Sequence, residues 1–140
     1  MNYTKLREVL TDHEGLKYKP YKCTAGKLTI GIGHNLDDRG VSPAVVDLMY
    51  EEDVTEVVAD LKVIFTNFDD LPYDIQIVLA DMRFQLGAGR FRKFKKMITA
   101  VKQSNWSEMI IQMKDSSWYK QTTNRANDLI SMVQKCYADK

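Results

Sequence analysis

The stretch from Glu14 to His34, E-G-L-K-Y-K-P-Y-K-C-T-A-G-K-L-T-I-G-I-G-H, decides the fold of this chain. Just before it, apolar residues recur at helical spacing over residues 2–13, and Gly15 is a natural helix stop. Inside the stretch, a proline and a turn at residues 24–26 exclude a helix, and residues 28–33 alternate as a strand does. We therefore expect a helix that leaves Glu14 at its end, followed by a small hairpin sheet.

The sequence after the hairpin predicts helices. A loop is expected at residues 37–40, and Ser42-Pro43 then provides an N-cap and a first-turn proline for a helix with a clear 3.6-residue period. At about 1.5 Å per residue, this helix would be ~35 Å long, enough to join two lobes. Later apolar stripes predict helices from Ile75 to Leu86 (ended by the glycines at 87 and 89), from Phe91 to Val101, from Ser107 to Met113, and from near Thr123 onward.

These elements predict an α+β fold, in which a small N-terminal β-hairpin lobe is joined by a long helix to an all-helical C-terminal lobe. A length of 140 residues suits a single domain, residues 1–140, with a cleft between its lobes. The sheet lobe is expected at about residues 14–42 and the linking helix at residues 43–66. The helical lobe would then consist of residues 1–13 and 67–140.

The composition is that of an ordinary globular protein, with 44% hydrophobic and 28% charged residues. No apolar run approaches the ~20 residues of a membrane span, so no stable membrane insertion is expected. The first ten residues alternate charged and apolar side chains and lack the apolar core of a signal peptide. We therefore expect a protein that is made and first held in a cytoplasm.

Charge is unevenly distributed along the chain, although the net charge is only +1. Residues 1–70 carry an excess of Asp and Glu, and residues 71–140 an excess of Lys and Arg. One local cluster of cations could bind a polyanion such as nucleic acid or cell wall, and a solvated helix face is the plainer interpretation. The cluster consists of Arg90, Arg92, Lys93, Lys95 and Lys96.

The two cysteines do not make a disulfide framework. Cys136 falls on the apolar face of the last helix, where a small buried side chain is the default, whereas Cys23 lies among polar residues and is more open to chemistry. A Cys23–Cys136 disulfide is an alternative without support in the sequence. The two histidines lie far apart in the sequence and lack neighbouring ligand residues, so we expect no metal site and no cofactor.

The residues that carry chemistry are Glu14, Cys23 and Thr29. A partly desolvated glutamate tends to keep its proton, as a general acid must. Glycoside hydrolysis needs such an acid at the leaving oxygen, together with a second group that activates water or attacks the anomeric carbon. Cys23 and Thr29, on neighbouring strands, could hold that water or supply that nucleophile.

At these residues the chain resembles the lysozymes, or endolysins, of the T-even phage type, a family of muramidases. The family's signature has a Glu, then Asp or Cys nine positions on, then Thr six further, and Glu14, Cys23 and Thr29 satisfy it. Two more segments look like the family's helical-lobe signatures, namely Phe84-Gln85-Leu86-Gly87 and Trp118-Tyr119-Lys120-Gln121-Thr122-Thr123-Asn124-Arg125-Ala126. Three motifs in the right order cover nearly the whole chain and imply a lysozyme-like fold.

The resemblance also implies roles for single residues. Glu14 would protonate the glycosidic oxygen, and Thr29 would hydrogen-bond the catalytic water. Cys23 stands where the best-known member has Asp, and our hypothesis is that it assists as a base or electrostatic stabiliser. Arg125 would form an ion pair with Glu14, and His34 one with Asp53 that is structural. The remaining implied contacts are to bound saccharide: Phe84, Gln85, Asn35 and Gln112, of which Asn35 departs from the apolar residue of the best-known member.

The implied function is hydrolysis of the β-1,4 bond between N-acetylmuramic acid and N-acetylglucosamine in bacterial peptidoglycan, for host lysis and phage release. The implied partner is the wall, not nucleic acid, and the protein would be a monomer that a phage holin releases from the host cytoplasm to the periplasm and wall. Two alternatives stay open: a non-catalytic module that binds wall or nucleic acid, and a cysteine hydrolase that uses Cys23 and His34. A lytic transglycosylase, which also uses one glutamate, would leave an anhydro-muramic product. Trp106 and Trp118 are expected in the core.

Overall fold

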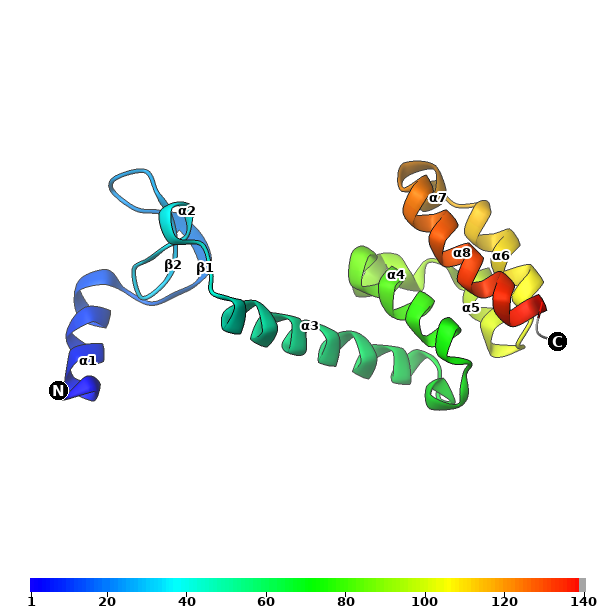
Figure 1. Ribbon diagram of the computed structural model, residues 1–140, viewed down its shortest axis with the longest axis horizontal. Helices are drawn as coiled ribbons and strands as arrows, with labels where there is room; N and C mark the ends of the chain where they lie inside the picture. The colour runs from blue at the N-terminus through cyan, green and yellow to red at the C-terminus, as the bar shows by residue number, and fades with distance from the viewer. Residues whose placement is uncertain (139–140) are drawn as a thin grey trace. The chain divides into compact units, whose positions relative to one another are not determined.

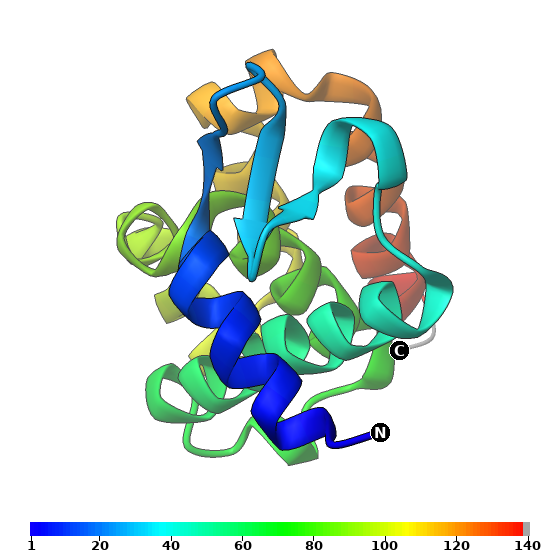
Figure 2. The ribbon, with the colours of Figure 1, turned by 90° about the vertical axis from the view of Figure 1, so that its left-hand side faces the viewer.

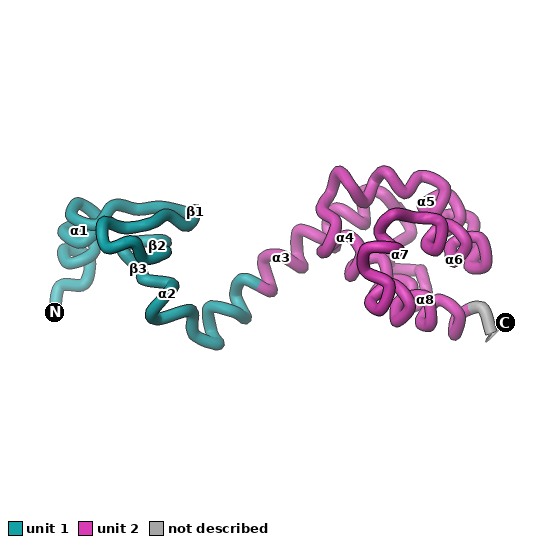
Figure 3. Tube along the Cα trace, turned by 90° about the horizontal axis from the view of Figure 1, so that it is seen from above, with its two compact units in different colours: residues 1–49 teal, residues 50–140 magenta. Residues whose placement is uncertain are grey.

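The computed structural model describes residues 1–138, and the chain divides into two compact units, residues 1–49 and 50–140 (Figure 3). The first unit contains α1 (Tyr3–Glu14), β1 (Lys17–Lys22), β2 (Leu28–Gly31), β3 (His34–Asn35), α2 (Leu36–Arg39) and the start of α3 (Pro43–Ile64). The second contains the rest of α3, η1 (Phe68–Asp70), α4 (Tyr73–Arg92), α5 (Lys95–Lys102), α6 (Trp106–Lys114), α7 (Ser117–Gln121) and α8 (Thr123–Ala138) (Figure 1). The α+β class is thereby confirmed, with a small N-terminal sheet followed by helices.

The first helix begins and ends where the sequence predicts. The side chain of Asn2 caps α1 by accepting a hydrogen bond from the backbone N–H of Lys5 at 3.0 Å. Gly15 ends the helix with a φ of 81°, which an L side chain adopts only at a cost, and its N–H donates to the carbonyl of Thr11 at 2.8 Å. Glu14 is therefore the last helical residue, immediately before the chain enters the sheet.

The sheet has three antiparallel strands in the order β1-β2-β3 (Figure 2). Tyr21 pairs with Thr29 across β1 and β2, and Ile30 pairs with His34 across β2 and β3. The register is irregular between Lys17 and Tyr21, the interval that contains Pro20, which has no N–H for the ladder. The hairpin expected from the sequence is thus extended by a short third strand.

A four-residue helix, α2, lies where a loop was expected, so that prediction was wrong. Asn35 caps it by accepting from the N–H of Asp38 at 3.0 Å, and the Asn35 amide donates to the Asp38 carboxylate at 2.9 Å. Asp37 accepts the backbone N–H of Leu28, in β2, at 2.6 Å. These polar contacts stabilise the single turn of α2, which has no buried side chain. One turn is too short to show apolar periodicity, so α2 could not be predicted from the sequence pattern.

The buried apolar core lies in the second unit. All of the buried apolar side chains among the described residues belong to residues 57–133, and Thr29 is the one buried residue in residues 1–49. The middle of α4 is central, with Ile75, Val78, Leu79 and Met82 fully buried. Helix α8 packs against α4 and α6, and α5 packs against α6. Trp106 and Trp118 are 3% exposed, which confirms that both belong to the core.

Two predicted helix boundaries in this unit were wrong. Gly87 leaves the helical conformation with a φ of 81°, yet helical residues resume beyond it, so α4 ends at Arg92 and contains Phe91. The next helix, α5, therefore begins at Lys95. The sequence also missed α7, which is capped by the Ser116 side chain and is too short to show a period. The predicted assignment of residues 1–13 and 67–140 to one lobe of a single domain stays a prediction.

Candidate active site

A tight turn in the first unit brings Cys23 and Thr29 together. The N–H of Cys23 donates to the carbonyl of Lys27 at 2.9 Å, and the N–H of Gly26 donates to the carbonyl of Cys23 at 2.8 Å. Thr29 follows on β2 and is 4% exposed, with its hydroxyl donating to the carbonyl of Lys27 at 2.8 Å. Two of the three predicted catalytic residues are thus neighbours because the β1–β2 turn closes over five residues.

The surroundings of Cys23 favour its thiolate. The backbone N–H of Lys27 and then that of Ala25 point at the sulfur and hold the pKa of the Cys23 thiol below its ordinary value. Desolvation acts in the opposite direction, and a hydrogen bond from the Thr29 side chain adds to the lowering of the pKa. A half-buried thiol with a lowered pKa is suited to act as a base or as a negatively charged group near a reacting centre.

Glu14 lies against the backbone of Gly33. Gly33 has a φ of 64°, and a Cβ added to it would be 2.8 Å from the Oε2 atom of Glu14 and 3.0 Å from the carboxyl carbon. The glutamate carboxyl therefore occupies the space that a side chain at position 33 would need. Residues 1–49 otherwise leave Glu14 exposed to solvent. The first unit thus contributes Cys23 and Thr29, together with the backbone at Gly33 against which the Glu14 carboxyl lies.

His34 and Asn35 make local contacts within the first unit. The Nε2 atom of His34 is 2.6 Å from the carbonyl of Gly40, and because a carbonyl only accepts, the imidazole carries its proton at Nε2. Among residues 1–138, no hydrogen bond between His34 and Cys23 is present, so the thiolate–imidazole pair of a cysteine hydrolase has no support here. The Asn35 side chain caps α2, and its contact with saccharide stays a prediction.

Phe84 and Gln85 lie on α4 in the second unit. Phe84 is 52% exposed, so its ring is available for contact with a ligand. The Nε1 atom of Trp118 donates to the Oε1 atom of Gln85 at 2.9 Å, so the Gln85 amide is held in one orientation with its NH2 group left for another acceptor. This pairing of a core tryptophan with a predicted sugar-contacting residue is not apparent from the sequence, because 32 residues separate the two.

Gln112 and Arg125, two further predicted residues of the second unit, have partners of their own. Gln112 donates to Glu108 at 2.8 Å, one turn away on α6. The Nε atom of Arg125 donates to Asp81 at 2.7 Å. The predicted pairs Glu14–Arg125 and His34–Asp53 each join residues of different units, and both stay predictions.

An ion-pair network in the second unit was missed by the sequence analysis. Asp60 on α3 accepts from Arg83 at 2.6 Å and from Arg92, and both arginines lie on α4. The hydrogen bonds from Arg92 and then Arg83 lower the pKa of Asp60 to about 2. Arg83 is 6% exposed, so this carboxylate compensates a buried cation and ties α3 to α4. It also removes Arg92 from the cationic cluster expected from the sequence.

The described residues contain no group of three or more His, Cys, Asp or Glu side chains that could hold a metal ion. No helix within residues 1–138 has the length and apolar character that a membrane span requires.

The chain is similar to several known proteins. The family model for phage lysozyme matches residues 11–134. A probable T4-type lysozyme 2 of Dictyostelium discoideum is 28% identical, with 94% of each chain covered. The pre-baseplate central spike protein Gp5 of Enterobacteria phage T4 is 27% identical over 91% of this chain and 27% of its own length. A peptidoglycan hydrolase, gp36 of Pseudomonas phage phiKMV, is 30% identical over 91% of this chain and 15% of its own.

The match to phage lysozyme, together with the similarity to a T4-type lysozyme and to a peptidoglycan hydrolase, identifies the chain as a lysozyme-type glycoside hydrolase. The chain belongs to the phage lysozyme family, whose model covers all three predicted catalytic residues. The family expected from the three sequence motifs is therefore confirmed, and the roles of the single residues in those motifs stay predictions.

Proposed function

We propose that this chain is a muramidase that hydrolyses the β-1,4 bond between N-acetylmuramic acid and N-acetylglucosamine in bacterial peptidoglycan. The proposal rests on one observation: the Glu14 carboxyl lies against the backbone of Gly33, in the same small unit in which the Thr29 side chain hydrogen-bonds Cys23. A carboxyl, a thiol of lowered pKa and a buried hydroxyl on one scaffold suit acid-assisted glycoside cleavage. The relative gp36, named a peptidoglycan hydrolase, supports this choice of substrate.

In the proposed mechanism, Glu14 is the general acid that gives its proton to the leaving glycosidic oxygen. Cys23 and Thr29 act on the other side of the bond: Thr29 orients a water molecule, and Cys23 accepts its proton or stabilises the positive charge that develops on the sugar. Phe84, Gln85, Asn35 and Gln112 contact saccharide. Arg125 pairs with Glu14, and His34 with Asp53, as structural links.

The test is loss of turbidity of purified, outer-membrane-stripped cell wall, with the wild type and Glu14→Gln side by side. Without the general acid, we expect the rate to fall by about 10²- to 10⁴-fold. Glu8→Gln is the matched control, because Glu8 is an exposed glutamate of the same helix whose partner is Lys5, and it should lyse walls at the wild-type rate. Full lysis by Glu14→Gln would rule out Glu14 as the general acid, and no lysis by either protein would favour a non-catalytic wall-binding module.

Analysis of the cleavage products distinguishes three classes of wall-degrading enzyme. New reducing sugars identify a muramidase, anhydro-muramic ends identify a lytic transglycosylase, and new free amines identify a peptidase. Mass spectrometry of trapped enzyme distinguishes an inverting route from one with a thioglycosyl intermediate at Cys23. Wild-type activity in Cys23→Ser would remove Cys23 from the mechanism.

We further propose that the protein acts as a monomeric endolysin, which accumulates in the host cytoplasm until a holin opens the membrane to the wall. Expression in a host cell without a holin should then leave the cells intact, and permeabilising their membrane with chloroform should cause rapid lysis. Lysis during expression alone would contradict the dependence on a holin.

A further inference from the structure

Helix α4 is interrupted at Gly87, and a single carboxylate on α3 contacts the helix on both sides of the interruption. Gly87 has a φ of 81° and a ψ of 169°, so the residues before and after it form two helical segments. Asp60 accepts hydrogen bonds from Arg83, which precedes the glycine, and from Arg92, which follows it. These contacts, called the Asp60 bridge below, therefore connect the two segments through α3.

The geometry of the Asp60 bridge fixes orientation as well as charge. The Nη1 atom of Arg92 donates to the Oδ2 atom of Asp60 at 2.8 Å, and its Nη2 atom donates to Oδ1, so the pair is bidentate. The Nε atom of Arg83 donates to the same Oδ2 atom at 2.6 Å. Arg92 also donates to the carbonyl of Ala88 at 3.2 Å, inside its own segment. The guanidinium thus holds residues 88–92 in one orientation relative to α3.

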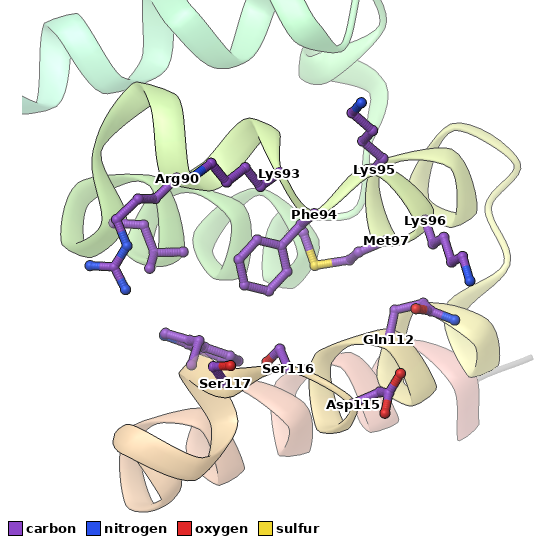
Figure 4. A pocket seen from close by; sticks show the side chains of 12 residues that line it. Arg90, Lys93, Phe94, Lys95, Lys96, Met97, Gln112, Asp115, Ser116 and Ser117 are labelled. Atoms are coloured by element: carbon purple, nitrogen blue, oxygen red, sulfur yellow. The ribbon is translucent and has the colours of Figure 1, made fainter.

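The segment after Gly87 has few other restraints. Phe91 is the one buried residue within residues 88–93. On one side the segment borders a cavity of about 520 Å³, and the ring of Phe94 lies in this space between α5 and α7 (Figure 4). A glycine at the break and a hollow beside the segment leave Phe91 as its apolar anchor. The bidentate contact of Arg92 supplies the second fixed point, which prevents rotation of the segment about Phe91.

The orientation of this segment is linked to Gln85 through Trp118. The ring of Phe94 meets Trp118 edge to face, with ring centroids 6.3 Å apart. The Nε1 atom of Trp118 donates to the Oε1 atom of Gln85 at 2.9 Å, and Gln85 lies two residues before Gly87. The contacts therefore form a closed path across the interruption in α4. A rotation of the second segment would move Phe94, and with it the indole that orients the Gln85 amide.

We propose that Asp60 and Arg92 are positioning residues for saccharide binding. By fixing the orientation of the two segments of α4, they hold the side chains of Phe84 and Gln85 where the glycan contacts them. These saccharide contacts rest on the proposed function. Neither Asp60 nor Arg92 touches the glycan or the general acid, so the Asp60 bridge affects the binding of substrate and not the chemical step.

The first test follows the Trp118 indole by nuclear magnetic resonance of the full chain. The chain contains two tryptophans and gives two indole N–H signals, which through-bond assignment distinguishes. Arg92→Gln should shift or broaden the Trp118 signal, because loss of the bidentate contact releases the segment that leads to Phe94. The Arg92 side chain is 42% exposed, and Arg83 keeps its own contact with Asp60 in this variant, so the variant should fold.

Two further variants serve as controls. Lys62→Gln makes the same change in net charge on α3, and Lys62 is exposed and pairs with Asp69 at 3.5 Å, outside the Asp60 bridge. Its Trp118 signal should match that of the wild type. Arg92→Lys keeps the charge but lacks the planar fork that makes the pair bidentate, so its Trp118 signal should lie between the other two. Thermal denaturation of each variant establishes that it is folded.

The second test separates substrate binding from chemistry by measuring KM and kcat on soluble, uncrosslinked glycan chains of peptidoglycan. Arg92→Gln should raise KM about 5-fold with kcat unchanged, because a neutral hydrogen bond to a saccharide contributes about this factor. Arg92→Lys should recover part of the loss, and Lys62→Gln should have the wild-type KM.

An unchanged Trp118 signal in Arg92→Gln would overturn the proposal, whatever the activity. A changed signal with an unchanged KM would also overturn it, since the orientation of Gln85 would then not govern binding. A fall in kcat alone would exclude a role confined to binding. If the wild type cleaves no glycan, the muramidase proposal fails by itself, and calorimetric affinity for the same glycan chains then takes the place of KM.

Discussion

The Thr29 hydroxyl has one proton and two acceptors within reach, the carbonyl of Lys27 and the sulfur of Cys23. When the thiol is protonated, the hydroxyl is free to donate to the carbonyl. When the thiolate forms, its charge makes it the stronger acceptor. We therefore expect the Thr29 hydroxyl to turn toward the sulfur when Cys23 ionises.

Cys23 should react with iodoacetamide at a lower pH than an ordinary cysteine. A lowered pKa means that the thiolate persists to lower pH, so the midpoint of the alkylation rate against pH should lie below about 8.5. The measurement uses a Cys136→Ala background, in which Cys23 is the single thiol. Thr29→Val should raise the midpoint, and Thr24→Val, on the exposed turn beside Cys23, should not. A midpoint equal to that of free cysteine would contradict the geometry of the turn.

At the scale of elements, β2 and the turn after it contain two glycines with similar positive φ angles and different surroundings. Gly31 has a φ of 69° and Gly33 a φ of 64°, but a Cβ at Gly31 would meet nothing within 4 Å, whereas one at Gly33 would meet the Glu14 carboxyl. Alanine at Gly31 should therefore show the effect of backbone strain alone, whereas alanine at Gly33 should also displace the carboxyl of the proposed acid, Glu14.

Gly31→Ala and Gly33→Ala should each lose about 1–2 kcal/mol of stability, since both place an L side chain in the left-handed region. Gly33→Ala should in addition lose about 10²-fold in wall lysis, because a catalytic group moved by about 1 Å loses its geometry. Thermal denaturation and turbidity assays on the two variants measure these effects. Equal activities would show that the contact between Gly33 and Glu14 has no catalytic role.

The contact between α3 and α4 depends on the carboxylate of Asp60. Its folded-state pKa of about 2 lies below the ordinary value of 3.8, so the ionised form is favoured by folding. The stability that this contributes is complete above about pH 4 and is lost as the pH falls toward 2. The corresponding free energy is about 2 kcal/mol.

Asp60→Asn should therefore unfold at lower denaturant concentration than the wild type at pH 7, by at least about 2 kcal/mol. The difference between the two proteins should shrink as the pH falls from about 4 to 2, because the wild-type carboxylate then takes up a proton. Glu56→Gln is the control: Glu56 is 3.7 Å from the same Arg83, but its side chain is 77% exposed, and we expect no more than about 0.5 kcal/mol. Urea titrations at several pH values measure both. A constant difference across this pH range would refute the assignment.

At the scale of the whole molecule, the chain combines an acidic first half with a basic second half. The basic half includes Arg90, Lys93, Lys95 and Lys96, none of which forms an ion pair within residues 1–138. A cell wall that carries free carboxylates is a polyanion, so the second unit should attract it over a distance set by the ionic strength.

Lysis should slow as salt is raised from about 0.01 M to 0.15 M, because the Debye length falls from about 30 Å to about 8 Å. Turbidity assays over this range measure the effect. Hydrolysis of an uncharged chitin oligosaccharide serves as the control and should change little. Salt-independent lysis would exclude the attraction between the basic unit and the wall.

Most of the secondary structure could be predicted, because it depends on residues close together in the sequence. Apolar periodicity marked α1, α3, α4, α6 and α8, and the glycines and proline after Glu14 marked the sheet. The errors fall where no period can form: α2 and α7 have only 4 and 5 residues, and Gly87 interrupts α4 without ending it. These features depend on caps and packing and not on a repeating pattern.

By itself, the sequence determined the family and the α+β order of elements, since both depend on residue type and spacing along the chain. The same spacing predicts Glu14, Cys23 and Thr29 as the catalytic residues, and that assignment stays a prediction. Only the tertiary structure decided what these residues touch. The seat of Glu14 on Gly33, the hydrogen bond from Trp118 to Gln85 and the pairing of Asp60 with Arg83 and Arg92 each join residues that are distant in the chain. Their spacing carries no signal, because a contact between distant residues depends on how the whole backbone folds.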